Sequence, residues 1–170
     1  LIHTHTHTHT RELTSFTYFI SFFCLHFQVL GRLHFALSDS LFVGGSEGKC
    51  LRASFGSKSS FSGQGVRAVP ELADADLTNA GALAGAVAFI MRGNSDPSSG
   101  GVACHEKARR AQHAGAIAVI VVNGEGRTNI GIGDPDDKAG DITIPVMSVP
   151  SSVGAKLVDG VEVKCVAAGW

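Results

Sequence analysis

The sequence predicts an α/β fold with a mixed β-sheet that contains one βαβ crossover. Two uninterrupted apolar runs, at residues 83–91 and 116–122, are typical of strands that are buried on both faces. A helix-forming segment at residues 102–114 separates them. Strand, helix and strand in this order imply one right-handed βαβ crossover between parallel strands. The 21 glycines and the Val, Ile and Ala content suit a small domain with tight turns.

Composition narrows the range of functions. The net charge of −1 and the charged fraction of 17% give no electrostatic reason to expect nucleic acid or an anionic membrane surface as a partner. With one Tyr and one Trp, the chain is also poor in the aromatic side chains on which bases stack. The four cysteines have none of the C-x-x-C spacing that zinc or dithiol chemistry needs. We therefore predict a protein without a cofactor.

Residues 1–40 differ from the predicted domain, which covers residues 41–170. The His-Thr repeat at residues 3–10 could hold a metal if extended, but a compositional tract specifies no ligand geometry. The Phe-rich, nearly uncharged segment 13–30 is long enough for a signal-peptide core or a marginal membrane helix. Three interpretations stay open: a signal peptide cleaved near Ser38, a membrane anchor, or noncoding sequence read as protein. Membrane contact is expected only through this segment.

The predicted domain begins with two short strands, at residues 51–55 and 66–69, which a Ser- and Gly-rich loop connects. The apolar run 83–91 follows and ends at an Arg-Gly-Asn turn. After the helix and the second buried run, a polar loop covers residues 123–140.

In the last part of the domain, the sequence predicts a strand at residues 144–149 and a short helix from Ser151 or Ser152 through Val158. A final strand is expected at residues 161–166, where apolar and polar residues alternate. Either serine can cap the short helix. The sheet is therefore expected to mix parallel and antiparallel pairs.

The helix at residues 102–114 has two predicted faces. Small residues at three- and four-residue spacing predict the face that packs on the sheet, whereas charged residues are expected to face water. The small face consists of Cys104, Ala108, Ala111 and Gly115. The charged residues are Glu106, Lys107, Arg109 and Arg110.

A possible nucleophile motif, G-x-S-x-G, covers residues 44–48 and offers Ser46 as the nucleophile, with His105 or His113 as the base. Such an elbow needs a buried strand before the serine and a helix after it. Residues 49–52 instead predict a turn that enters a strand. A small serine hydrolase that uses Ser46 is therefore a weak alternative.

Candidate metal ligands lack a converging geometry. Consecutive helical residues such as Cys104, His105 and Glu106 point about 100° apart and cannot meet at one ion. Four aspartates in the Gly-rich loop suggest a weak calcium site, but Pro135 and the missing acidic residue at the twelfth position exclude an EF-hand. We predict solvated turns and no metal site. The aspartates are Asp134, Asp136, Asp137 and Asp141.

Three segments occur in a characteristic order: GAVAFIMRG at residues 85–93, HEKARRAQHAGAIAVIVVN at 105–123 and ITIPVMSVPSSVGAKL at 142–157. Together they resemble the protease-associated (PA) domain family, with its Arg-Gly turn, its Lys-Ala helix and buried strand, and its Ile-Pro-Val strand followed by a short helix. The chain departs from the family at residues 95–104, where members often carry Cys-x-Phe and this loop is longer and has no Phe.

The resemblance implies a compact, twisted mixed β-sheet or β-sandwich with two flanking helices. It also implies a domain without catalytic residues of its own. Family members occur in secreted or endomembrane proteins: as insertions in subtilisin-like and zinc peptidases, in sorting receptors, including vacuolar ones, and in membrane-bound ubiquitin ligases. They are thought to bind substrates, cargo or neighbouring domains. We therefore expect a non-catalytic module that binds a protein or peptide partner in a larger secretory-pathway protein. The alternative is the accessory domain of a peptidase whose catalytic part lies outside this chain.

Loops on a rigid scaffold usually carry binding, so the two long polar loops are the predicted contact surface. The candidate binding residues are Asn94, Ser95, Asp96, Ser98, Ser99, Glu125, Arg127, Asn129 and Asp134.

A disulfide between Cys50 and Cys165 is possible if the domain is lumenal, because the two residues flank the first and last predicted strands. Cys104 is a competing partner for either thiol, and sequence alone does not choose between them.

The buried-strand interpretation makes the substitution Ile120→Asp a sharp test. A carboxylate in the middle of the run 116–122 would have no partner and would cost several kcal/mol, enough to prevent folding. Thermal unfolding followed by circular dichroism should show no cooperative transition. A variant that is soluble and melts like the wild type would refute the strand.

Overall fold

The computed structural model of the chain describes residues 38–127 and 129–168. The His-Thr repeat and the apolar segment 13–30 lie outside the described residues. The first strand, β1, begins at Ser40, and the last strand, β8, ends at Val166. Both belong to a compact unit that covers Asp39 to Ala168.

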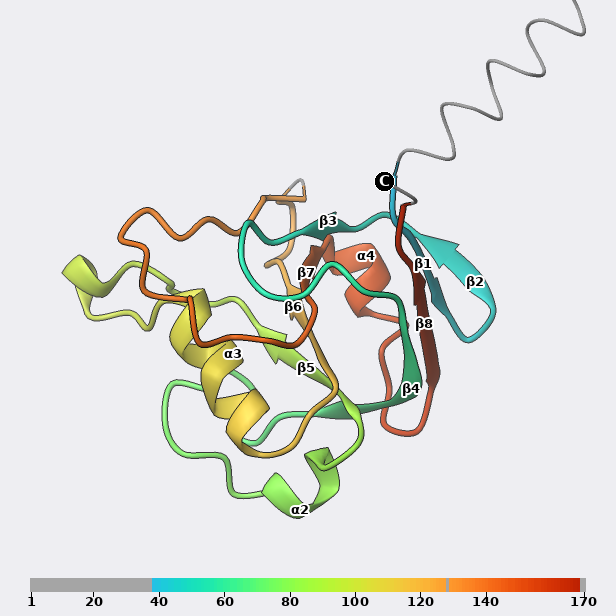
Figure 1. Cartoon of the computed structure of the whole chain (residues 1–170), viewed down its shortest axis with the longest axis horizontal. Helices are drawn as coiled ribbons and strands as arrows, with labels where there is room; N and C mark the ends of the chain where they lie inside the picture. The colour runs from blue at the N-terminus through green and yellow to red at the C-terminus, as the bar shows by residue number, and fades with distance from the viewer. Residues whose placement is uncertain (1–37, 128, 169–170) are drawn as a thin grey trace, which may run out of the picture. The chain divides into compact units, whose positions relative to one another are not determined.

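Eight strands form one curled mixed sheet in the order β2-β1-β8-β4-β5-β6-β7-β3 (Figure 1). The strands on the β2 side pair antiparallel, whereas β4, β5, β6 and β7 are parallel neighbours and β3 closes the far edge antiparallel to β7. The predicted mixture of pairings is therefore present. The bounds are β1 Ser40–Val43, β2 Ser46–Gly48, β3 Leu51–Arg52, β4 Phe61–Arg67, β5 Val87–Met91, β6 Ala118–Val122, β7 Val146–Val149 and β8 Glu162–Val166.

The predicted βαβ crossover is confirmed. Helix α3, Cys104–His113, connects β5 to β6, which are parallel from the pair Val87 and Ala118 to the pair Met91 and Val122. Alternate residues of both strands enter two separate hydrophobic cores, one beneath α3 and one beside β1, β8 and the one-turn helix α4, Ser151–Gly154. Burial on both faces is the reason for the uninterrupted apolar runs.

The predicted sheet face of α3 is confirmed in part: Gly115 lies beyond the end of the helix and is exposed, and one residue of the predicted charged side is buried. Cys104, Ala108 and Ala111 are buried. Lys107 was expected to face water but is only 1% exposed, and its Nζ donates to the carbonyls of Arg92 (2.7 Å) and Met91 (3.4 Å). Burial lowers the pKa of Lys107. A lysine can be buried here because backbone carbonyls at the C-terminal end of β5 accept hydrogen bonds from its ammonium group.

Several element bounds differ from those predicted. The first part of the run 83–91 is not strand: helix α2, Ala80–Leu83, ends there, and Gly85 adopts φ +76° before β5 begins. β3 keeps only two residues of the predicted strand 51–55. The N-cap of α4 is Pro150 and no side chain caps it, so neither serine has the predicted capping role.

Strand β4 begins inside the segment predicted as a loop. Its sequence, FSGQGVR, suggests a turn, but the strand continues through both glycines, and Gly65 is needed for packing. A Cβ at Gly65 would lie 2.2 Å from Cε1 of Phe89, a ring that is 2% exposed. β4 pairs with β8 through Gln64 and with β5 from Gly65 onward, so the glycine lies where the strand changes neighbour.

The hairpin β1–β2 was not predicted, and it contradicts the nucleophile-elbow setting that the hydrolase alternative needs for Ser46. Gly44 and Gly45 form its two-residue turn with φ of +54° and +78°, values for which glycine is the favoured residue. Ser46 begins the edge strand β2 and pairs with Val43. The motif is therefore a hairpin turn, and Ser46 does not have the strand-to-helix setting of a nucleophile.

Cys50 and Cys165, the possible disulfide pair, are free thiols in this structure. Nη2 of Arg52 donates to Sγ of Cys165 (3.6 Å), and Sγ of Cys50 donates to the carbonyl of Asp39 (3.7 Å). Burial raises the pKa of Cys50 to about 12 and that of Cys165 to about 11, so both remain protonated and poorly nucleophilic.

The packing at Gly65 predicts that Gly65→Ala is destabilising. The added methyl group would overlap the Phe89 ring in a filled core, and overpacking of this kind costs about 1–3 kcal/mol. Urea unfolding should show a lower midpoint. Gly140→Ala is the matched control, because Gly140 is exposed and its Cβ would meet nothing within 4 Å. Equal midpoints for the two variants would contradict the packing argument.

Candidate functional site

A cleft of about 550 Å³ lies between the two loops that flank the βαβ unit, at the first turn of α3. Its volume is within the range of about 300–1,000 Å³ that is usual for ligand pockets. One wall comes from the β5–α3 loop and the other from the loop that follows β6. In Figure 1 both loops extend beyond the N-terminal end of α3. The lining residues are Arg92, Ser95, Pro97, Gly101, Val102, Ala103, Cys104, His105, Glu106, Arg110, Ile132, Gly133, Pro135, Asp136 and Lys138.

Arg92 belongs to the Arg-Gly turn at the end of β5 and is 8% exposed. Its Nη1 donates to Oδ1 of Asn123 (2.8 Å) and to the carbonyl of Ile130, and its Nη2 donates to the carbonyl of Gly131 (2.9 Å). The guanidinium therefore holds the loop after β6 against the end of β5. Its Nε is buried and has no hydrogen-bond partner among the described residues.

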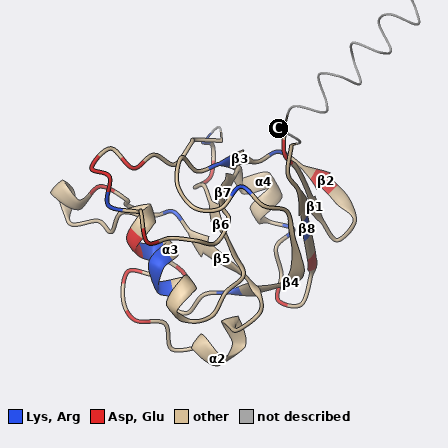
Figure 2. Cartoon of the chain, viewed as in Figure 1, with Lys and Arg blue, Asp and Glu red and all other residues tan. Residues whose placement is uncertain are grey.

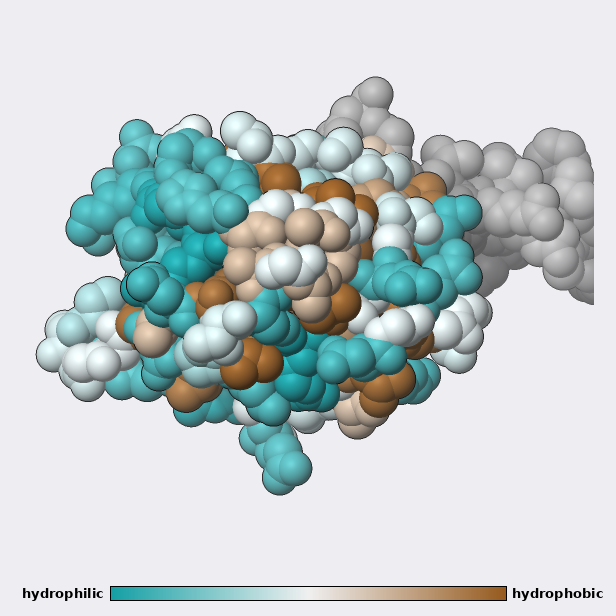
Figure 3. Space-filling model, turned by 90° about the horizontal axis from the view of Figure 1, so that it is seen from below, coloured by the Kyte–Doolittle hydropathy of each residue, from teal (hydrophilic) through white to brown (hydrophobic). Residues whose placement is uncertain are grey.

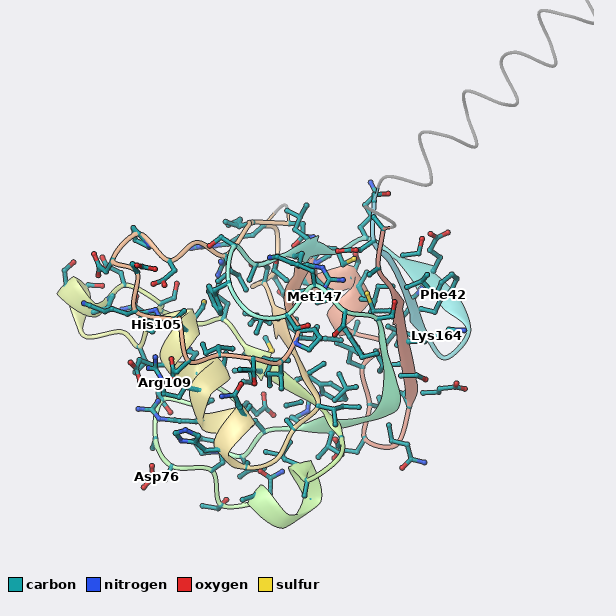
Figure 4. The ribbon with its side chains drawn as sticks, viewed as in Figure 1. Phe42, Asp76, His105, Arg109, Met147 and Lys164 are labelled. Carbon is teal, nitrogen blue, oxygen red and sulfur yellow. The ribbon has the colours of Figure 1, made fainter. Side chains whose placement is uncertain are left out.

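His105 lies in the first turn of α3 (Figure 4). Two carboxylates lie near its ring nitrogens. Its Nδ1 is 3.7 Å from Oδ1 of Asp134, and its Nε2 is 3.6 Å from Oε1 of Glu106. Oδ2 of Asp134 accepts from the backbone N–H of Ala139 (2.7 Å). Burial raises the pKa of Asp134, but the backbone hydrogen bonds from Lys138 and Ala139 outweigh it, so the net pKa is lowered.

The β5–α3 loop is held by its own side chains. Nδ2 of Asn94 donates to Oγ of Ser99 (3.0 Å), and Oδ1 of Asp96 accepts from both the N–H and the Oγ of Ser98. These bonds support a short 3-10 turn, η1, at Pro97–Ser99. The loop thus has a defined shape despite its polar sequence.

The opposite loop is fixed to α3 by two side chains of the helix. Arg109 donates from Nε and Nη2 to the two carboxylate oxygens of Asp141 (2.6 and 2.7 Å) and from Nη2 to the carbonyl of Lys138. Gln112 donates to the carbonyl of Asp141 and accepts from the N–H of Thr143 (2.8 Å). The hydrogen bonds from Arg109 lower the pKa of Asp141 to about 2.

The structure brings some of the predicted binding residues to the cleft and places others elsewhere. Ser95 lines the cleft, and Asp134 lies behind its wall beside His105. Glu125 and Arg127 lie on an exposed turn away from the lining. Asn129 bonds with Asn123 and with the carbonyl of Ser148 (3.2 Å). The remaining predicted residues, Asn94, Asp96, Ser98 and Ser99, form the loop described above.

The residues that sequence reasoning missed at this cleft are the charged ones. Arg92, Arg110 and Lys138 line it together with His105 and Glu106. A signal existed for Arg92, because the Arg-Gly turn ends a buried strand at the point where the loop begins. The others come from α3 and from the loop after β6, and only the folded chain shows that they line the same cleft.

Charge and hydropathy distinguish this end of the molecule from the rest. Figure 2 shows charged residues of both signs along α3 and the loops beside it. Figure 3, which keeps the left side of Figure 1 on the left, shows mostly hydrophilic surface at this end and only separated hydrophobic patches elsewhere on that face. Within residues 38–127 and 129–168, no His, Cys, Asp and Glu side chains gather in threes as metal ligands would. None of the helices in those ranges has the length and hydropathy to cross a bilayer.

The PA domain family model matches residues 43–157 of the chain. Similar solved structures include a zinc aminopeptidase from Bacillus subtilis, BSAP, with a TM-score of 0.56 and 23% identity, for which the match covers 75% of this chain and 29% of that one. An aminopeptidase from Aneurinibacillus sp. strain AM-1 has a TM-score of 0.53 and 19% identity over 78% of this chain and 31% of that one.

A subtilisin-like protease, Apa1, from Pseudoalteromonas sp. AS-11 is similar to a comparable extent, with a TM-score of 0.52 and 18% identity over 76% of this chain and 33% of that one. No curated protein matches the chain. The chain thus spans about a third or less of the peptidases whose structures it resembles, and at these identities the likeness concerns the fold.

The bond between Arg109 and Asp141 makes the substitution Asp141→Asn informative. We expect faster hydrogen exchange of the backbone amides at residues 138–143, because the loop loses its ionic link to α3. Asp136→Asn is the control, since the pair of Asp136 with Lys138 is 62% exposed on both sides. Equal exchange in the two variants would show that the link does not hold the loop.

The bond between Arg109 and Asp141 also predicts how the stability of the loop changes with pH. The folded pKa of Asp141, about 2, lies below its ordinary value of 3.8, so the contribution to stability is complete above 3.8 and disappears as pH falls through about 2. Amide resonances of residues 138–143, followed during an acid titration of the wild type, should report this loosening. Loosening already complete above pH 3.8 would contradict it.

Proposed function

Because the chain belongs to the PA domain family, we propose that it is a non-catalytic module that binds a protein or peptide segment in the cleft at the first turn of α3, within a larger protein of the secretory pathway. The observation that carries this proposal is the cleft itself. Two loops with defined shapes face each other across it: side-chain hydrogen bonds within the β5–α3 loop hold one, and Arg109 fixes the other to α3. Such preorganisation reduces the entropy lost when a segment binds.

The non-catalytic part of the proposal is supported by the kinds of protein that share the fold. The similar structures include a zinc aminopeptidase and a subtilisin-like protease, whose names imply different catalytic chemistries. A module common to both is not expected to supply either chemistry. The match to about a third of each chain is in keeping with an accessory role.

The positions of the module's ends also support a place within a longer protein. Ser40 of β1 pairs with Val166 of β8, and the N–H of Ala168 donates to Oδ1 of Asp39 (2.9 Å). A longer chain can therefore enter and leave the module at one place, as an inserted domain requires. The family resemblance adds a secreted or endomembrane-lumen setting, which includes sorting receptors.

The accessory domain of a peptidase is the second candidate, favoured by the peptidases among the similar structures. The two candidates differ in what the cleft binds. A sorting or adaptor module would select a particular peptide sequence, whereas an accessory domain would bind a segment of the catalytic domain or of its substrate. Transcript sequence that continues beyond Trp170 into a catalytic domain, or into a membrane helix and RING domain, would distinguish them.

A peptide-display selection on the purified chain tests the proposal. Selected peptides should bind the wild type and lose at least tenfold in affinity on Gly133→Trp, because Gly133 lines the cleft and its Cβ points into open space. Fluorescence anisotropy of labelled peptides measures the affinities.

Gly140→Trp is the matched control, since Gly140 is also unobstructed but does not line the cleft. Equal weakening by both tryptophans, or by neither, would place the bound peptide elsewhere and reject the cleft as the site. Steady hydrolysis of fluorogenic peptide or ester substrates by the purified chain would reject the non-catalytic assignment.

A further inference from the structure

We propose that the outer face of the antiparallel half of the sheet is an interface at which two copies of this chain associate around a two-fold axis. The face belongs to β2, β1, β8 and β4. It is separate from the cleft: Figure 4 shows Phe42 and Lys164, which lie on this face, on one side of the domain and His105, which lines the cleft, on the other. Three features carry the inference: an aromatic side chain on a polar face, a hollow beside it, and a charge pattern that is complementary to itself.

The alternation of side chains along the strands defines the face. On β1 and β8 the inward residues, such as Leu41 and Cys165, are almost completely buried, so their neighbours in the chain point to the other side of the sheet. These neighbours are exposed or half-buried. The outward residues of the four strands are Ser40, Phe42, Glu47, Ser62, Gln64, Glu162, Lys164 and Val166.

Phe42 is the aromatic residue of this face. It is half-buried, although the solvated side of an antiparallel pair usually carries polar side chains. Beside it lies a hollow of about 230 Å³, which is lined by Phe42, Gly45, Glu162 and Lys164. Aromatic side chains are enriched among the residues that carry binding energy at protein interfaces. The face therefore has both a ring that a partner can bury and a hollow that a partner's ring can fill.

The charges on β8 select a second copy of the chain as that partner. Glu162 and Lys164 are exposed, point to the same side and make no ion pair with any described residue. If β8 of a second copy lies antiparallel across the first, with the two-fold axis at Val163, Glu162 of each copy opposes Lys164 of the other. Parallel stacking would instead put like charges together. Charges that meet in this way fix the orientation of an interface.

The same reversal brings the ring of each copy to the hollow of the other. Phe42 pairs with Lys164, and the N–H of Gly44 donates to the carbonyl of Glu162 (2.9 Å). Phe42 is therefore level with Lys164, and the Gly44–Gly45 turn is level with Glu162. Around the axis, Phe42 of each copy faces the glycine turn of the other, where no side chain projects. The ring can therefore enter the hollow that Gly45 lines.

Strand β4 extends this complementarity. Ser62 pairs with Lys164. Gln64 pairs with Glu162, so around the same axis the hydroxyl of Ser62 in each copy faces the amide of Gln64 in the other. Aligned stacking of two sheets is a common packing arrangement. The outward residues are far fewer than the roughly 20–30 per side of a standard interface, so we expect a weak, reversible dimer.

Two opposite charge reversals test the inference. Glu162→Lys leaves two lysines on the outer side of β8, and Lys164→Glu leaves two glutamates. Each variant alone should dimerise about tenfold more weakly than the wild type, because like charges then meet around the axis. An equimolar mixture of the two should recover the wild-type dissociation constant to within about threefold, because every lysine then opposes a glutamate. Sedimentation velocity of the full chain over a range of concentrations measures the association.

Two further variants sharpen this test. The double variant Glu162→Lys/Lys164→Glu restores the alternating pattern in the opposite order, so it should dimerise like the wild type. Asp76→Lys is the matched control, because it reverses an exposed carboxylate that lies away from Phe42 and Lys164 in Figure 4, and it should leave the association unchanged. Thermal unfolding should show that all variants fold, since the substituted side chains are exposed.

Two outcomes would overturn the inference. A wild-type chain that is monomeric at every concentration would leave the face to another partner, such as a neighbouring domain of a longer protein. Association that both single variants retain, or that their mixture does not recover, would show that the copies meet through a different surface.

Discussion

The architecture depends on one strand that belongs to two differently arranged parts of the sheet. β4 is antiparallel to β8 through Gln64 and parallel to β5 from Gly65, so the sheet curls where the strand changes partner. The absence of a side chain at Gly65 lets the ring of Phe89 lie directly against the backbone. Phe89 enters the core between β5, β6 and the β1–β8 side, whereas its neighbours Ala88 and Ile90 enter the core beneath α3. The two hydrophobic cores therefore lie on opposite faces of the same central strands, and the curled sheet borders both cores.

A small number of polar contacts fix the walls of the cleft to the central strands. Lys107, buried under α3, joins the helix to the carbonyl of Arg92 at the end of β5. Arg92 in turn holds the loop after β6 through Asn123 and Gly131. The partners of Lys107 and Arg92 are chiefly backbone carbonyls. Their hydrogen bonds therefore depend on the path of the backbone more than on the identity of particular side chains. The cleft walls are thus set by the βαβ unit, and the loops that form them can differ in sequence while the helix terminus stays in place.

The sequence was most informative where burial is complete. The runs at residues 83–91 and 116–122, with the small face of α3 between them, predicted the crossover because residues buried on both sides must all be apolar. It was least informative at glycines. The segment FSGQGVR suggested a loop although Gly65 has a packing role, and Gly44 and Gly45, which form a hairpin turn, suggested a nucleophile motif. The burial of Lys107 was not predicted because its partners are the carbonyls of Met91 and Arg92 at the end of β5, outside the helix. The two predicted loops do face each other across the cleft. Hydrogen bonds within the chain, however, engage the side chains of Asn94 and Asp96. Arg92 and His105 line the same cleft only because of the tertiary structure.

The pairing of β1 with β8, closed by Asp39, Arg52 and Ala168, has a consequence for chain entropy. If a host protein holds residues 39 and 168 close together, the unfolded module is a closed loop rather than a free chain. Closing a loop of more than a hundred residues removes conformational freedom worth about 4–5 kcal/mol in the chain-entropy model used for disulfides. A rigid host would therefore act as a covalent crosslink from outside, and the module needs no bond between Cys50 and Cys165 to obtain that stabilisation. The same sequence would then be appreciably more stable within its host than as a free chain.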